Sequence, residues 1–368
     1  MEPLNVVIVG AGRAGRELHV EAFAAQPGVR VVAVCDKDPA RAAEMAQAAG
    51  VPHHHGDLAE ALAAHQPQVV SICTPPQVHA EQVCQAVDAG ADVLVEKPIA
   101  ASVEEARRMW DYATSHGRKL AFVHNRKFSP SARRAEDLIR AGHIGRVITV
   151  QANWLSDGDD DRMLAVQDFW CHRLRGGRWA ETAPHSIYLA WQFVGPMQME
   201  QVWARKLFPQ RFPWVTSDEV AACLRAERAY VWLRFSSNCP RAERNKGLGL
   251  RHSVLLQGSE GALLISGSRL HVLDGPKGPG KPTKRRGLIG KFSRAFRKYV
   301  GPRRRPAKET STGGPAAATG HFDLIAQFIR HVRGQDETPV PWDEALGVVT
   351  LTEQLGEGIE AAVARSRS

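Results

Sequence analysis

The sequence predicts an α/β protein in which an N-terminal doubly wound parallel sheet precedes a C-terminal α+β domain with a largely antiparallel sheet. In residues 1–123, short apolar runs rich in β-branched residues alternate with helical patterns, as in parallel sheets built from right-handed crossovers. Between residues 197 and 273, strand-like runs follow one another without a helical pattern between them. We therefore expect a first domain at 1–123 and a second domain at 124–368.

The first predicted strand runs directly into a glycine-rich turn. Residues 4–9 are mostly β-branched and apolar, and Gly10-Ala11-Gly12-Arg13-Ala14-Gly15 follows them with the spacing Gly-x-Gly-x-x-Gly. The first glycine permits a tight turn, the second lets a pyrophosphate approach the backbone, and the third lets the helix pack closely on the strand. Unpaired N–H groups at the start of the following helix favour phosphate. This segment predicts a dinucleotide-binding Rossmann fold.

An acidic residue ends the second predicted strand and bears on the choice of cofactor. Residues 31–35 form that strand, and Asp36 follows it at the distance from the glycines at which a carboxylate binds ribose hydroxyls. Asp36 favours NAD, because a carboxylate accepts from the 2′-hydroxyl and repels a 2′-phosphate. The neighbouring cations Arg13, Lys37 and Arg41 leave NADP as the alternative.

The rest of the first domain follows the same alternation. We predict helices at 39–49, from Asp57 onward, at 77–89 and at 103–115, and strands at 69–73, 93–95 and 120–123. Polar residues follow these strands. Because the carboxyl ends of parallel strands meet at one edge of a sheet, we expect them to surround one cleft: Asp36, Thr74, Lys97 and Asn125.

The second half opens with a helix at 131–141 and a strand at 147–154. A Gly-Gly turn then leads into a helical segment that contains Glu181 and His185. Residues four apart share one helix face, so this carboxylate can orient the imidazole as a general base. Predicted strands at 220–225, 230–235, 253–257 and 262–265 and two terminal helices at 322–332 and 342–364 complete the chain.

The net charge of +9 comes from one insertion. Residues 275–308 contain thirteen Lys and Arg and no acidic residue, which leaves 35 basic against 39 acidic residues elsewhere. Within the flexible, basic insertion 275–315, residues 288–300 place apolar and basic side chains on opposite helical faces. This pattern is typical of a helix on an anionic membrane surface, with contact through 284–305. Packing on the protein itself is an alternative, and nucleic-acid binding is unfavoured.

The cysteines and histidines predict neither disulfides nor a metal site. The six cysteines are scattered and form no Cys-x-x-Cys pair, so we expect reduced thiols and a cytoplasmic protein. A peripheral place at the inner face of the membrane would follow if the basic insertion binds there. His53, His54 and His55 are adjacent, and consecutive side chains point in different directions, so we expect no bound metal.

Three motifs together resemble the Gfo/Idh/MocA family of oxidoreductases, named after glucose-fructose oxidoreductase, inositol dehydrogenase and the rhizopine catabolism protein. They are the glycine turn at 10–15, Thr74-Pro75-Pro76-x-x-His79 and Glu96-Lys97-Pro98. The resemblance extends over most of the chain outside the basic insertion. It implies an NAD(P)-dependent dehydrogenase or reductase that acts on a CH–OH group of a sugar, cyclitol or sugar conjugate. It also implies an open-faced second sheet and a homo-oligomer, a dimer or tetramer.

The resemblance also implies roles for particular residues. The catalytic residues would be Lys97, His185 and Glu181, the last of which stands where the family has aspartate. The cofactor-binding residues would be Gly10, Gly12, Arg13, Ala14, Gly15, Asp36, Lys37, Arg41, Thr74, Pro75, Pro76, His79, Glu96, Lys97 and Asn125. The substrate-binding residues would be Lys97, Arg126, Trp154, Trp170, Arg173, Arg178 and His185. The alternative is a catalytically inactive nucleotide-binding module with a membrane-associated or regulatory role.

Overall fold

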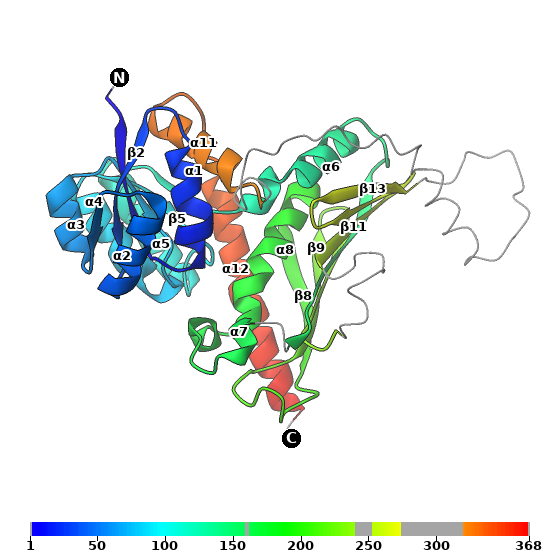
Figure 1. Cartoon of the computed structure of the whole chain (residues 1–368). Coiled ribbons are helices and arrows are strands. Elements are labelled where there is room, and N and C mark those ends of the chain that lie inside the picture. Colours follow the sequence, from blue (N-terminus) through cyan, green and yellow to red (C-terminus); the bar gives the residue numbers. More distant parts are fainter. Residues whose placement is uncertain (1, 159–161, 240–251, 274–318, 367–368) are drawn as a thin grey trace, which may run out of the picture.

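The chain folds around two β-sheets that lie side by side and are joined by long helices (Figure 1). The computed structural model describes residues 2–158, 162–239, 252–273 and 319–366. The predicted fold class, a parallel sheet followed by a largely antiparallel one, is confirmed.

The first sheet contains six parallel strands in the order β3-β2-β1-β4-β5-β6. Buried Val, Ile and Leu side chains on both faces account for its continuous apolar runs. The strand order reverses beside β1, and ligands of such sheets bind at this switch point, beyond the carboxyl ends of the strands. The strands are β1 (Leu4–Val9), β2 (Val29–Cys35), β3 (His53–His55), β4 (Val69–Ile72), β5 (Asp92–Val95) and β6 (Leu120–Phe122).

Helices connect these strands, and local side-chain caps fix several of their starts. Asp38, Asp57 and Ser102 each accept a hydrogen bond from a backbone N–H of the first helical turn. The first connection begins with a π-helical turn, η1 (Gly15–His19), which continues as α1 (Val20–Ala24). The other helices are α2 (Pro39–Ala49), α3 (Leu58–His65), α4 (His79–Asp88) and α5 (Val103–Ser115).

The three adjacent histidines form the edge strand β3, which the sequence analysis did not predict. Their backbone pairs with β2, from Ala33 to Cys35. On the side of α3, the Nε2 atoms of His55 and His65 lie 2.9 Å apart.

The second sheet contains seven strands in the order β13-β12-β11-β7-β10-β9-β8. Every neighbouring pair is antiparallel except β7 and β10, which run parallel. The strands are β7 (Val147–Leu155), β8 (Met197–Arg205), β9 (Glu219–Ala226), β10 (Tyr230–Ser236), β11 (His252–Gly258), β12 (Ala262–Ser266) and β13 (Arg269–Leu273).

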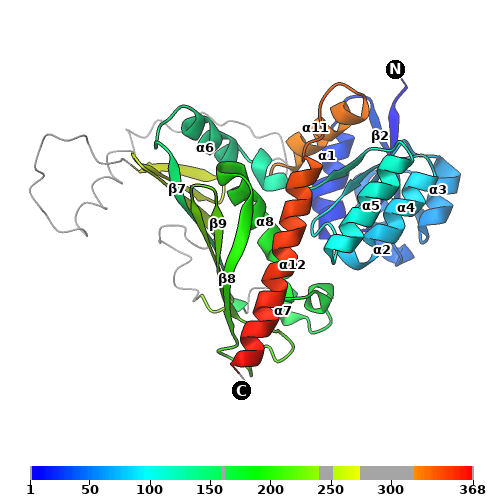
Figure 2. The ribbon, with the colours of Figure 1, turned by 180° about the vertical axis from the view of Figure 1, so that it is seen from behind.

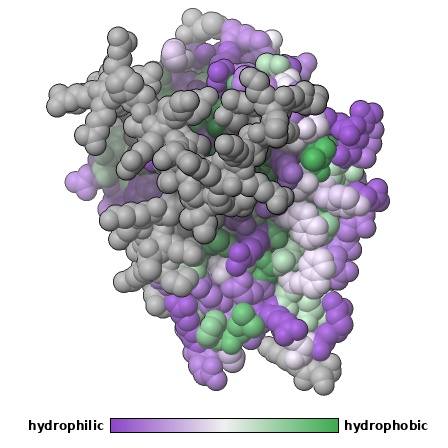
Figure 3. Space-filling view, turned by 90° about the vertical axis from the view of Figure 1, so that its right-hand side faces the viewer, coloured by the Kyte–Doolittle hydropathy of each residue, from purple (hydrophilic) through white to green (hydrophobic). Residues whose placement is uncertain are grey.

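Helices cover one face of this sheet, and none of the helices that the structure describes lies on the other face, which we call the open face (Figures 1 and 2). The helices of the second half are α6 (Pro130–Arg140), α7 (Arg162–Ala165), α8 (Arg178–Val194) and α12 (Trp342–Arg365). The long helix α12 packs along β8 and α8 and also reaches α5 of the first sheet, where the Trp342 and Trp110 rings stack 4.7 Å apart. On the open side, pale and green patches lie between hydrophilic ones (Figure 3). Trp203, Tyr230 and Trp232 are about half exposed there.

The chain returns to the first sheet near its end. Helix α11 (His321–Val332) packs beside α1, and its Leu324 and Phe328 side chains join the apolar cluster that contains Ile8 and Phe23. The C-terminal segment therefore completes the core of the first sheet.

The predicted insertion at 275–315 and its helix at 288–300 lie outside the described residues. Among the helices that the structure describes, none is long and apolar enough to cross a lipid bilayer.

Candidate active site

The glycine turn lies at the carboxyl end of β1, where the first sheet reverses its order. Gly10 has φ +101°, and a Cβ there would lie 2.9 Å from the carbonyl carbon of Cys73. A Cβ at Gly15 would lie 2.0 Å from the Gly10 carbonyl oxygen, so this position needs glycine for packing. Gly12 differs, because the nearest atom to its Cβ would be Arg41 Nη2 at 3.9 Å. The backbone at Gly12 faces open space, as a pyrophosphate site requires.

Asp36 lies beside this turn. Its Oδ2 accepts a hydrogen bond of 2.7 Å from the Ala11 N–H, and its Oδ1 accepts one of 3.0 Å from the Asp38 N–H. Arg41 donates to the Ala11 carbonyl at 3.4 Å, while the exposed Arg13 pairs with Glu17. The carboxylate thus stands at the end of β2 against the glycine turn, which fits a ribose-binding position.

Several residues predicted to bind the cofactor are bonded to other protein groups, and all of them except Thr74 are buried. Thr74 Oγ1 donates to Gln82 at 2.6 Å. The His79 ring bridges the carbonyls of Thr74 and Ile99. Asn125 Nδ2 donates to the Thr319 carbonyl at 2.6 Å, and the Glu96 carboxylate contacts two histidines. These hydrogen bonds hold the loops that follow β4, β5 and β6 at the carboxyl edge of the sheet.

Lys97 and Glu181 form an ion pair between the two sheets. Lys97 follows β5, and its Nζ donates to Oε1 of Glu181 on α8. The other carboxylate oxygen accepts from Thr182 Oγ1 at 3.0 Å and lies 3.7 Å from Arg178 Nη1. Burial alone would raise the pKa of Glu181, but Lys97 and Arg178 hold it below its usual value. The carboxylate therefore stays ionised.

His185 lies one turn further along α8 and stacks on Trp154 of β7. The ring centroids are 5.8 Å apart and the ring planes differ by 6°. Burial lowers the pKa of His185 well below its usual value, and the charges of Lys97 and Arg126 lower it further. The imidazole is therefore neutral near physiological pH and can accept a proton. Among the described residues, no hydrogen bond joins it to Glu181, whose carboxylate faces Lys97 instead of orienting His185.

Trp154 brings further side chains to the cleft. The Arg126 guanidinium lies 4.8 Å from the centre of its ring, and burial lowers the pKa of Arg126 to about 10. His252 at the start of β11 stacks on Trp154 at 4.0 Å. His252 was not predicted from the sequence, since only the pairing of β11 with β7 brings it to this place.

The remaining predicted substrate residues lie at different depths. Arg178 is buried, with 2% of its side chain exposed. It donates to Thr182 and its charge stabilises the Glu181 carboxylate, so it contacts Glu181 and is not exposed to a substrate. Trp170 lies in a 3-10 turn whose carbonyl accepts from Gln77 Nε2 at 3.3 Å, beside the turn after β4. Arg173 is exposed. The structure therefore brings together five of the predicted residues: Lys97, Glu181, His185, Trp154 and Arg126. Arg178, Trp170 and Arg173 lie around this group.

Comparison with known families matches most of the chain. Residues 4–124 match a family described as an oxidoreductase family with an NAD-binding Rossmann fold. Residues 132–264 match the GFO/IDH/MocA C-terminal domain.

Individual proteins show the same likeness. The D-glucoside 3-dehydrogenase of Escherichia coli (strain K12) is 32% identical over 153 residues, which cover 42% of this chain and 44% of that protein. The chain thus spans less than half of that relative. A crystal structure of an oxidoreductase from Agrobacterium radiobacter, in complex with NAD+, L-tartaric acid and magnesium, has TM-score 0.75 and 17% identity and covers 97% of this chain and 96% of that one. The myo-inositol 2-dehydrogenase from Lactobacillus plantarum has TM-score 0.74 and 18% identity and covers 98% of both chains.

Proposed function

We propose that this chain, which belongs to the Gfo/Idh/MocA oxidoreductase family, transfers hydride between nicotinamide and a hydroxyl or carbonyl carbon of a sugar, cyclitol or sugar conjugate. One observation carries the proposal. The Lys97–Glu181 pair and the neutral His185 stand at the carboxyl edge of the sheet whose β1 carries the glycine turn. The names of the sugar and inositol dehydrogenases similar to this chain support the substrate class.

Each of the three side chains has a distinct task in the proposed mechanism. Lys97 donates a hydrogen bond to the substrate oxygen and stabilises the negative charge that develops on it. Glu181 keeps the ammonium in place through their ion pair. His185 accepts the hydroxyl proton during oxidation and returns it during reduction. The bound nicotinamide supplies hydride chemistry, and the protein supplies orientation and electrostatics.

Trp154 and its neighbours offer both apolar and hydrogen-bonding contacts to a polyol. His252 stacks on the indole, His185 lies parallel to it, and the Arg126 guanidinium lies over its ring. We propose that a sugar ring contacts the half-buried edge of Trp154 and that Arg126 donates to its oxygens. Incubation with NAD+ and a panel of D-glucose, D-xylose, myo-inositol and methyl β-D-glucoside, followed by NADH absorbance, tests the activity. Bound cofactor without turnover on any compound of a wider polyol panel would favour the inactive module.

We expect NADH to bind more tightly than NADPH, because the Asp36 carboxylate stands where a 2′-phosphate would lie. Asp36→Ser removes that charge and one partner of the Ala11 N–H. The variant is expected to lose about tenfold in NADH affinity, the equivalent of one hydrogen bond to a charged group, while NADPH affinity rises. Titrations followed by nicotinamide fluorescence measure both constants. Tighter binding of NADPH than NADH by the wild-type protein would overturn the proposed role of Asp36.

We further propose that the open face of the second sheet forms a homo-oligomer interface, in a dimer or tetramer. Trp203 and Trp232 flank β9 on this face, and large exposed aromatic side chains are enriched at protein interfaces. Contact of residues 284–305 with an anionic membrane surface stays a prediction from the sequence, as does the location in the cell.

The double variant Trp203→Glu/Trp232→Glu is expected to convert the oligomer to monomer, because it would bury like charges in the contact. Light scattering coupled to size-exclusion chromatography measures the mass. Phe208→Glu is a matched control, since Phe208 is 52% exposed but lies in the loop after β8. An unchanged mass of the double variant would exclude this face as the interface.

A further inference from the structure

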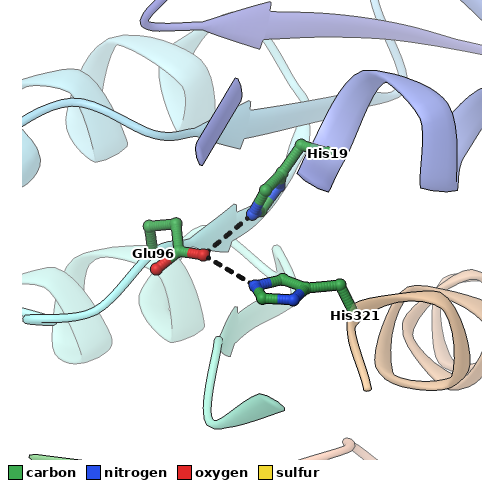
Figure 4. Close-up of side chains that lie close together, drawn as sticks. All are labelled: His19, Glu96 and His321. Carbon is green, nitrogen blue, oxygen red and sulfur yellow. Dashed lines mark hydrogen bonds and ion pairs between the residues drawn. The ribbon is translucent and has the colours of Figure 1, made fainter. Parts of the chain in front are cut away.

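A buried carboxylate joins three distant parts of the chain beneath Lys97. Glu96 Oε1 lies 3.0 Å from His19 Nε2 and 3.2 Å from His321 Nε2 (Figure 4). His19 comes from η1, Glu96 follows β5, and His321 begins α11. All three residues are at most 5% exposed. Burial alone would raise the pKa of Glu96, but the hydrogen bonds from the two imidazoles hold it well below its usual value.

The same carboxylate holds the backbone of Lys97. Its second oxygen, Oε2, accepts a hydrogen bond of 2.8 Å from the Lys97 N–H. One group therefore binds the two imidazoles with one oxygen and the lysine backbone with the other. Removal of one donor leaves a buried charge partly unpaired, and such a charge moves or draws in water.

Thr319 and Gly320 position His321 and also contact Asn125, in the turn after β6. Thr319 Oγ1 lies 2.7 Å from His321 Nδ1, and the Thr319 carbonyl accepts from Asn125 Nδ2 at 2.6 Å. Gly320 has φ +87°, and a Cβ there would lie 2.3 Å from the Asn125 carbonyl oxygen. The C-terminal segment thus touches both the Glu96 loop and the turn that carries Arg126.

We propose that His321 is a positioning residue that holds Lys97 in its place through the Glu96 carboxylate. The role of the held lysine rests on the proposed function, whereas the holding itself does not. In this arrangement the imidazole fixes Glu96, Glu96 fixes the Lys97 backbone, and the ammonium keeps its contact with Glu181. The C-terminal segment, far away in sequence, completes the catalytic cleft of the first sheet.

Two histidines and a carboxylate within 4.8 Å of one another are also the donor set of a metal site. The hydrogen-bond pattern favours a site in which the two imidazoles donate to Glu96 without a metal ion. Burial lowers the pKa of His19, but Cys73 and Glu96 raise it to about 10, so His19 carries a proton that competes with a metal ion. Each Nδ1 lies within 2.8 Å of a hydroxyl oxygen, Ser71 for His19 and Thr319 for His321.

Reactivity of the Lys97 amine toward an acylating reagent tests the proposal without any substrate. In the wild-type protein the Lys97 side chain is 14% exposed and its ammonium is ion-paired, so we expect acetylation by an N-hydroxysuccinimide ester to be slow. His321→Leu removes the donor and is expected to speed acetylation of Lys97 by about fivefold or more through local opening. His321→Gln keeps an N–H donor of similar reach and is expected to stay near the wild-type rate. Mass spectrometry of the Lys97 peptide measures each rate.

Lys206 is the internal control. Its Nζ donates to the carbonyls of Phe212 and Val215, next to the second sheet, so its rate reports general loosening. Equal acceleration of Lys97 and Lys206 in His321→Leu would show a merely structural role and overturn the proposal, as would unchanged Lys97 reactivity. Stoichiometric zinc or another transition metal in the purified wild-type protein, lost in His321→Leu, would also overturn the proposal. That result would show that His19, Glu96 and His321 bind a metal ion. Absence of dehydrogenase activity would leave this test intact.

Discussion

A Lys97→Met variant is expected to lose about 10²- to 10³-fold in kcat, the usual cost of removing one donor to a developing oxyanion, and to bind NADH like the wild-type protein. Methionine keeps the unbranched apolar stem of the side chain as far as Cε but lacks the ammonium and cannot donate a hydrogen bond. The loss should fall mainly on kcat, because the negative charge on the substrate oxygen develops during hydride transfer. The measurement is steady-state turnover of the compound from the polyol panel that the wild-type protein oxidises fastest.

Lys97→Met is also expected to lower the stability of the protein, because it leaves the buried Glu181 carboxylate without its main partner. Glu181 is 10% exposed, and without Lys97 its remaining described partners are Thr182 and the more distant Arg178. Lys97→Met/Glu181→Gln removes both charges, so it should be more stable than Lys97→Met alone while it stays inactive.

Lys127→Met is a matched control, because Lys127 lies in the turn after β6 with its Nζ 6.0 Å from the Phe128 ring. Full turnover by Lys97→Met would remove this lysine from the mechanism. Bound NADH without turnover by the wild-type protein would favour the nucleotide-binding module.

Most of the first sheet was predictable because its information is local. Five of its six strands are short apolar runs, and three of its helices begin at a side-chain cap. The glycine turn joins the first strand to its helix with a spacing that few other structures require. The polar residues at the carboxyl ends follow from the parallel arrangement. For this reason the sequence alone predicts that Asp36 and Lys97 lie at one edge of the sheet.

Features that depend on long-range pairing were not predictable. The parallel contact between β7 and β10 is set by the packing of the whole second sheet. His252 meets Trp154 only because β11 pairs with β7. His321 reaches Glu96 only because α11 packs against the first sheet, and no local sequence pattern predicts that packing. The partner of Glu181 was also misjudged, since helical spacing alone cannot reveal Lys97 on the facing loop.

The glycine turn offers a prediction that separates folding from cofactor binding. Gly12→Ala is expected to weaken NADH binding by about 10- to 100-fold, the equivalent of one charge-assisted hydrogen bond to phosphate. The added methyl group would stand where the backbone must approach the pyrophosphate. The melting temperature should stay near the wild-type value, because the nearest atom to the new Cβ is 3.9 Å away and Gly12 has no positive φ.

Gly15→Ala provides the contrast, because its Cβ would lie 2.0 Å from the Gly10 carbonyl oxygen. That collision is with backbone, so the π-helical turn must shift and the protein should lose about 1–3 kcal/mol or more of stability even without cofactor. Thermal unfolding and NADH titration of both variants distinguish the two roles. Wild-type NADH affinity in Gly12→Ala would place the pyrophosphate elsewhere. If the melting temperature of Gly12→Ala falls as much as that of Gly15→Ala, all three glycines are needed for packing.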